Sequence, residues 1–196
     1  MVVPIALDAG APTDEAPDGP GPRLTLLVRG AHLKDHGGEI GYPGGKPDPG
    51  DVDLRATAAR EMREEIGIAE EDVAWLGPLS PCPVITGRYV IHPFVAVVRA
   101  GVEPRIASAG EVERLLTLPI LPVLRGEIPI YAVSGEWRGV QIFAPHFRIG
   151  ARVLYGASAY FTYQLLARIA AALGVSLPAP IVEGAPPWGD RYHRDG

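Results

Sequence analysis

The sequence has a single cysteine, no long apolar run and no excess of basic residues. Cys82 is the only cysteine among 196 residues, so no disulfide can form within the chain. No stretch approaches the roughly 20 uninterrupted apolar residues that a transmembrane helix requires. The N-terminus also lacks the basic start and apolar run of a secretory signal. We therefore expect a soluble, cytoplasmic protein that does not act at a membrane.

The distribution of charge is more informative than its total. A net charge of −5 argues against a partner that is nucleic acid, because such binding relies on basic side chains that neutralise phosphates. Segment 46–72 has nine acidic and four basic residues, so it carries the whole excess of −5 and the remainder is balanced. Such a local negative field suits a cation site better than an anion site.

The order of the expected elements favours an α/β fold, with helices on a mixed β-sheet in an α/β/α sandwich. Strands are expected at 1–7, 23–29, 73–79, 89–98, 128–133 and 139–143, and helices at 54–66, 110–116 and 151–173. Residues 1–175 are expected to form this single domain. Within it, residues 8–22 have the Pro, Gly and Asp content of a mobile loop, and residues 176–196 form a Pro/Gly-rich tail.

The helix expected at 54–66 has clear signals at both ends. Asp53 is a good N-cap residue, and Gly67 is a good residue just beyond the C-terminus. Apolar residues recur every four positions and predict a buried stripe along one face, which consists of Leu54, Ala58, Met62 and Ile66.

Three glutamates lie on the same helix. Glu61, Glu64 and Glu65 are three and four positions apart, so their carboxylates project from one side and can converge. Like charges at this spacing destabilise an exposed helix by a few tenths of a kcal/mol per pair, roughly, so stability does not require them. A hard divalent cation does, because Mg²⁺ prefers oxygen ligands. The competing interpretation is a solvated acidic face.

Neighbouring residues support a cation site. Arg60 can bridge to Glu64, four positions on, or reach Asp51, and would thereby orient the carboxylates. Gly44 and Gly45 have no side chains to obstruct a backbone carbonyl turned toward a metal ion.

Residues 60–68 (REMREEIGI) resemble the second half of the Nudix box, and Gly45 corresponds to its opening glycine. Asp51 stands where the box usually has Glu, one residue further from Arg60 than the standard spacing. The resemblance implies a Mg²⁺- or Mn²⁺-dependent hydrolase that cleaves a diphosphate linkage. The implied metal ligands are Glu61, Glu64, Glu65 and Gly45, and the implied catalytic residues are the three glutamates with Arg60.

Residues 26–45 are similar to the signature of the coenzyme A pyrophosphatases within this family. Arg29, Lys34, Gly38 and Tyr42 occupy its positions before Pro-Gly-Gly. The similarity implies that coenzyme A or an acyl-CoA is cleaved to 3′,5′-ADP and a 4′-phosphopantetheine. Arg29, Lys34 and Tyr42 would then bind the substrate.

Two alternatives stay open. One keeps the fold and reaction but takes ADP-ribose, a dinucleotide or a nucleoside triphosphate. The other is a non-catalytic ligand sensor with the same fold, against which the intact glutamates argue. The general base is one of the helix glutamates or an acid on a later loop such as Glu111. A homodimer is a reasonable assembly for this class.

Overall fold

The structure is a computed structural model, and it describes residues 1–7, 21–84, 89–137 and 140–189. The chain divides into two compact units, Met1–Leu121 and Pro122–Gly196. The mobile loop expected at 8–22 lies almost entirely outside the described residues, and so do the last seven residues of the expected tail. In the described part of the chain, no helix combines the length and apolarity needed to cross a bilayer.

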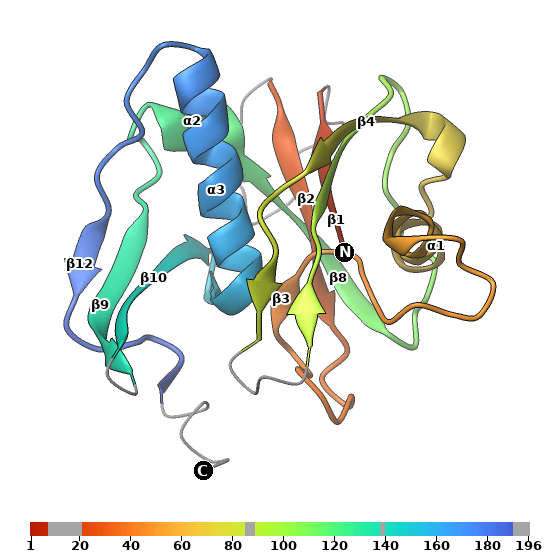
Figure 1. The fold of residues 1–196 in the computed structure, drawn as a ribbon, viewed down its shortest axis with the longest axis horizontal. Helices are drawn as coiled ribbons and strands as arrows, with labels where there is room; N and C mark the ends of the chain where they lie inside the picture. Colours follow the sequence, from red (N-terminus) through yellow and green to blue (C-terminus); the bar gives the residue numbers. More distant parts are fainter. Residues whose placement is uncertain (8–20, 85–88, 138–139, 190–196) are drawn as a thin grey trace. The chain divides into compact units, whose positions relative to one another are not determined.

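The first unit is built on a mixed sheet in the order β3-β2-β1-β7-β4, and a sixth strand, β8, also pairs with β2 (Figure 1). Strand β1 is parallel to β7 and antiparallel to β2, so the sheet is mixed as expected and the α/β class is confirmed. Its strands are β1 (Val2–Ala6), β2 (Arg23–Arg29), β3 (Ile40–Gly41), β4 (Val73–Pro78), β7 (Phe94–Val98) and β8 (Val112–Pro119). A separate pair joins β5 (Cys82–Pro83) to β6 (Val90–Ile91).

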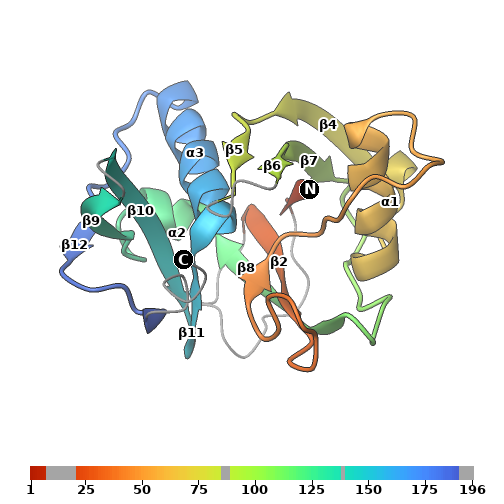
Figure 2. The same ribbon diagram turned by 60° about the horizontal axis from the view of Figure 1, so that its bottom comes forward.

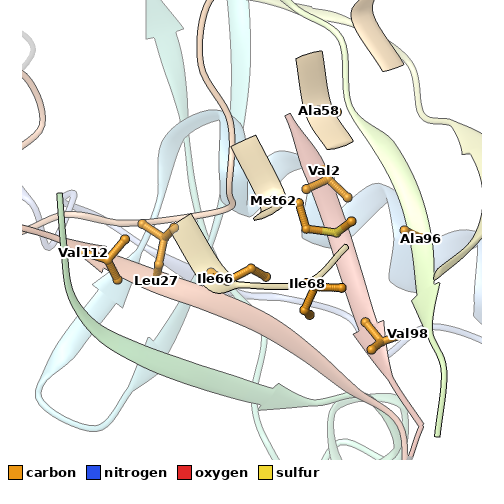
Figure 3. Close-up of a cluster of buried hydrophobic side chains, with 9 residues drawn as sticks. All are labelled: Val2, Leu27, Ala58, Met62, Ile66, Ile68, Ala96, Val98 and Val112. Atoms are coloured by element: carbon orange, nitrogen blue, oxygen red, sulfur yellow. The ribbon is translucent and has the colours of Figure 1, made fainter. Parts of the chain in front are cut away.

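Helix α1 (Leu54–Ile66) has the predicted bounds. The side chain of Asp53 accepts a hydrogen bond from the Ala56 N–H at 2.7 Å, and Gly67 adopts the left-handed conformation with φ of 68°. Figure 3 shows Ala58, Met62 and Ile66 directed into a cluster with side chains from β1, β2, β7 and β8. Leu54 does not belong to the predicted stripe: it is the first helical residue, lies outside this cluster, and is 40% exposed.

Two other expectations for the first unit need correction. The predicted helix at 110–116 is wrong, because Val112–Pro119 forms β8 and pairs antiparallel with β2 along its whole length. Its Glu, Arg and Leu residues favour a helix locally, but pairing with β2 buries Val112, Leu116 and Leu118. The expected strand at 89–98 is interrupted at His92-Pro93 and becomes β6 and β7.

The second unit has a four-stranded sheet in the order β11-β10-β9-β12, and α3 (Gly156–Ala172) packs beside β10 (Figure 2). The sheet consists of β9 (Tyr131–Trp137), β10 (Val140–Ile149), β11 (Arg152–Leu154) and β12 (Ile181–Glu183), and α2 (Ile120–Leu124) links the units in sequence. The predicted pairing of two strands is confirmed as β9 with β10, although both strands are longer than expected. The last helix starts later than predicted, because residues 152–154 pair with β10.

A buried cluster ties β12 to this sheet, although an irregular tail was expected there. His146 on β10 is fully buried, and its Nε2 lies 2.9 Å from a carboxylate oxygen of Glu183 on β12. Tyr131 stacks on the His146 ring with centroids 5.5 Å apart, and Trp188 meets the same ring edge-on at 5.3 Å. The segment after α3 is therefore held by the contact of Glu183 with His146 and by ring contacts.

Candidate active site

Arg60 is the centre of the charged network on α1. Its Nε and Nη2 donate to the two carboxylate oxygens of Asp51, each at 3.2 Å. Its Nη1 donates to Glu61 and to Glu64, each at 3.0 Å. The two contacts suggested by the sequence, with Asp51 and Glu64, are thus both present. Hydrogen bonding to Arg60 lowers the pKa of Asp51 to about 2, so this carboxylate stays charged at neutral pH.

Arg60 also fixes the loop that precedes the helix. Its Nη2 donates to the Lys46 carbonyl at 3.1 Å, while the Asp48 N–H donates to Asp51 at 2.9 Å. One guanidinium therefore links loop 46–51 to two glutamates of α1. Asp51 makes this contact although its side chain is one methylene shorter than the Glu of the usual box. The longer loop accommodates the difference, because extra loop length costs little free energy.

Glu65 is the most buried of the three glutamates. Its side chain is 2% exposed, and one carboxylate oxygen accepts a hydrogen bond from the Gly44 N–H at 3.0 Å. The other oxygen lies 3.8 Å from Nη1 of Arg29. Burial raises the pKa of Glu65 to about 7, the negative charges of Glu61 and Glu111 add to the increase, and the Gly44 N–H and Arg29 oppose it.

Glu61 lies against the glycine turn. A Cβ atom at position 45 would be 2.1 Å from Oε1 of Glu61, so only glycine permits this approach. Burial raises the pKa of Glu61 too, whereas the adjacent Arg60 lowers it. The structure therefore brings the Gly44-Gly45 turn against Glu61 and Glu65, which follow it by 16 to 21 positions in the sequence.

Glu64 differs from the other two glutamates because its side chain is 48% exposed. Within the described ranges, no three His, Cys, Asp or Glu side chains are arranged to hold a metal ion. Arg60 engages Glu61 and Glu64, while Glu65 faces Gly44 and Arg29. The donors are nevertheless of the right chemistry, because carboxylate and carbonyl oxygens beside a turn without side chains suit Mg²⁺ or Mn²⁺.

The residues expected to bind substrate are placed differently from one another. Arg29 ends β2 at an irregularity in the pairing with β8, and its side chain points to Glu65. Lys34 is exposed in a loop that is closed by the Gly38 N–H, which donates to the Arg29 carbonyl at 2.9 Å. Gly38 has φ of 76°, which explains glycine there. The side chain of Tyr42 is only 4% exposed and belongs to the core.

One contact near the site has no sequence signal. The ammonium of Lys46 lies 4.9 Å from the ring centroid of Tyr89, which precedes β6. These residues are 43 positions apart in the sequence, so no local spacing indicates that they meet. Glu111, named from the sequence as a possible base, influences the pKa values of Glu61 and Glu65 through its charge, and its carbonyl accepts from the Gly30 N–H at 2.8 Å.

Known proteins share both the sequence pattern and the fold. The NUDIX domain family model matches residues 15–128. A Photorhabdus laumondii protein described as "Uncharacterized Nudix hydrolase NudL" is 30% identical over 150 residues, which are 76% of this chain and 79% of that protein. A Yersinia pestis protein with the same description is 40% identical over 101 residues, 52% of this chain and 50% of its own length.

Among solved structures, a Nudix hydrolase from M. smegmatis, RenU, aligns with a TM-score of 0.53 and 14% identity. The alignment covers 88% of this chain and 84% of that one, and it supports the fold alone. The family match over more than half of the chain and the 30% identity to the Photorhabdus laumondii protein show that this chain belongs to the Nudix hydrolase family. Members of this family generally use divalent cations.

Proposed function

We propose that this chain is a divalent-cation-dependent hydrolase of the diphosphate linkage in nucleoside diphosphate derivatives, with coenzyme A or an acyl-CoA as the substrate. The observation that carries the proposal is the position of Glu65. This carboxylate is buried against the Gly44 N–H and has its pKa raised to about 7, an arrangement that disfavours its charged form in the absence of a cation. Perturbed acids in such positions are typical of functional sites.

The roles of the residues follow from their contacts. Glu61, Glu64, Glu65 and the Gly45 carbonyl would hold the cation, which when bound would polarise the diphosphate and activate water. Arg60 would keep Glu61 and Glu64 oriented through its bonds to both carboxylates. Glu111 or one of the three glutamates would accept the proton from the attacking water.

The choice of coenzyme A is supported by the signature in residues 26–45. Arg29 lies beside Glu65 with its side chain 31% exposed, where it can contact an anionic group of a bound substrate. Lys34 is exposed in the loop that begins after Arg29 and offers a second cation. Tyr42 is a buried residue, and we propose that it supports the Pro-Gly-Gly turn from beneath while contacting substrate little.

Initial rates on a panel of diphosphates test the proposal. The full chain is assayed with Mg²⁺ and with Mn²⁺ on coenzyme A, acetyl-CoA, ADP-ribose, a dinucleoside polyphosphate and a nucleoside triphosphate. We expect the highest kcat/KM for coenzyme A or its acyl derivative, with 3′,5′-ADP as one product. Equal or higher values for ADP-ribose would overturn the coenzyme A assignment and retain the hydrolase.

The same panel separates an enzyme from a sensor. A sensor would bind one of these diphosphates in calorimetry and release no product with either cation. An enzyme releases product, and chelation by EDTA abolishes the release.

A further inference from the structure

Tyr89 and Lys46 form an exposed aromatic and cationic pair beside the candidate active site. The Tyr89 side chain is 53% exposed, which is more than the intermediate burial typical of tyrosine. The Lys46 ammonium lies 4.9 Å from the ring centroid, a cation–π distance. At exposed sites such a contact contributes little to stability, so it does not by itself account for a tyrosine in solvent.

The pair is joined to the carboxylates through the backbone of Lys46. Arg60 donates from Nη2 to the Lys46 carbonyl at 3.1 Å and from Nη1 to Glu61 at 3.0 Å. Lys46 also directly follows Gly45, where an added Cβ atom would lie 2.1 Å from Oε1 of Glu61. The backbone of Lys46 is therefore fixed beside the glutamates of α1, and its side chain extends from there to the Tyr89 ring.

The charge of Lys46 is available to a ligand. In the described part of the chain its ammonium forms no ion pair with a carboxylate, although acidic residues dominate segment 46–72. The backbone of Tyr89 is also held in place. Its carbonyl accepts a hydrogen bond from the Val84 N–H at 3.0 Å, next to the β5–β6 pair. Its position is thus set by backbone bonds, and its ring is left for contact.

We propose that Tyr89 and Lys46 form the subsite for the nucleoside end of the substrate, with the base stacked on the Tyr89 ring and a phosphate bound by the Lys46 ammonium. This inference rests on the proposed function for its biological setting. An aromatic side chain can stack on any base, because every base has a π-face. The subsite therefore selects substrates that have a phosphorylated nucleoside and discriminates weakly among bases.

Equilibrium binding tests the subsite without requiring turnover. Adenosine 5′-monophosphate and ribose 5-phosphate have the same phosphate, and only the first has a base. Their affinities for the full chain are measured by calorimetry with MgCl₂, since neither contains a diphosphate to be cleaved. We expect wild-type protein to bind adenosine 5′-monophosphate at least about 5-fold more tightly, as stacking requires.

Substitutions assign the effect to each residue. Tyr89→Leu should abolish the preference for the nucleotide, and Tyr89→Phe should keep it because the ring remains. Lys46→Met should weaken the binding of both ligands by a similar factor. Val90→Ala alters the neighbouring residue, which is 54% exposed, and should change neither affinity.

The outcomes separate this inference from the proposed function. A wild-type protein without preference for the nucleotide, or a Tyr89→Leu variant that retains it, would overturn the subsite even if coenzyme A is hydrolysed. A protein that shows the expected preference but hydrolyses no diphosphate would support the subsite and contradict the proposed enzyme. In active protein, Tyr89→Leu should raise KM and leave kcat nearly unchanged.

Discussion

Each unit of the molecule has a deeply buried ionisable side chain, Glu65 in the first and His146 in the second, and the surroundings of the two differ. Glu65 in the first unit has a backbone N–H and a distant Arg29 as partners, while Glu61 and Glu111 add negative charge. His146 in the second unit contacts the carboxylate of Glu183 directly and is covered by rings. In the second unit the protein itself supplies the polar partner of the buried ring. Around Glu65, Arg29 offsets only part of the negative charge, and a bound cation would offset more of it.

The largest expected effect, a fall in kcat, comes from removing the carboxylate of Glu65. Glu65→Gln keeps the shape and one acceptor for the Gly44 N–H but loses a proposed metal ligand. We expect kcat to fall by at least about 100-fold while circular dichroism stays native. Glu70→Gln is the matched control, because Glu70 is half exposed and forms only a surface pair with Arg55. Wild-type rates in Glu65→Gln would remove Glu65 from the site.

The glycine turn is the next most sensitive part of the first unit. Gly45→Ala places a methyl group 2.1 Å from the Glu61 carboxylate, so that side chain must move. Displacements of this size typically reduce turnover by about 10- to 100-fold. Gly50→Ala is a close control, because its added methyl group meets no atom within 4 Å. Equal steady-state rates in Gly45→Ala and Gly50→Ala would contradict a role of the glycine turn in placing Glu61.

The pH dependence of stability is expected to reflect Glu65 in metal-free protein. Its pKa of about 7 in the folded state is above the usual value of 4.5, so the folded state retains a proton that the unfolded state releases. Stability should therefore fall as pH rises from 4.5 to 7, by about 3 kcal/mol from this group, and level off above. Urea unfolding in EDTA measures the slope. Glu65→Gln should make the free energy of unfolding nearly independent of pH in this range. An unchanged slope in that variant would show that other groups cause the pH dependence.

Arg60 stabilises the folded state by offsetting the repulsion among the acidic side chains that it contacts. Arg60→Met leaves Asp51, Glu61 and Glu64 without their shared cation, and we expect a loss of about 2 kcal/mol in the free energy of unfolding. Saturating Mg²⁺ should recover part of this loss in thermal melts. Arg55→Met, which removes a half-exposed surface pair, should cost less than about 1 kcal/mol. Equal losses in the two variants would contradict a special role for Arg60.

The smallest effect is expected in the second unit. Glu183→Gln removes the charge opposite His146 and should lower the free energy of unfolding by about 1 kcal/mol, with no change in Mn²⁺ affinity measured by calorimetry. Glu127→Gln, in an exposed pair with Arg125, serves as the control for a lost surface charge. A large change in Mn²⁺ affinity in Glu183→Gln would contradict the expectation that this contact serves stability alone.

Local signals predicted some of these features and missed others for identifiable reasons. The bounds of α1 were predictable because the Asp53 side chain caps the N-terminus of the helix, and Gly67 readily adopts the left-handed conformation at its C-terminus. The contact of Arg60 with Asp51 was predictable from the motif and from charge. Strand β8 was not, since its residues favour a helix until β2 is beside them. The meeting of Lys46 with Tyr89 depends on tertiary packing alone.

The placement of β1 also has a consequence for how the protein folds. Val2 pairs with Phe94, so this strand and its parallel neighbour are 92 positions apart in the chain. Closing so long a loop costs entropy before any contact is gained, and topologies with such distant pairing reach the native state slowly. Until that closure occurs, the inner edges of β2 and β7 lack a partner and invite association with other chains, so recovery from denaturant should depend on protein concentration.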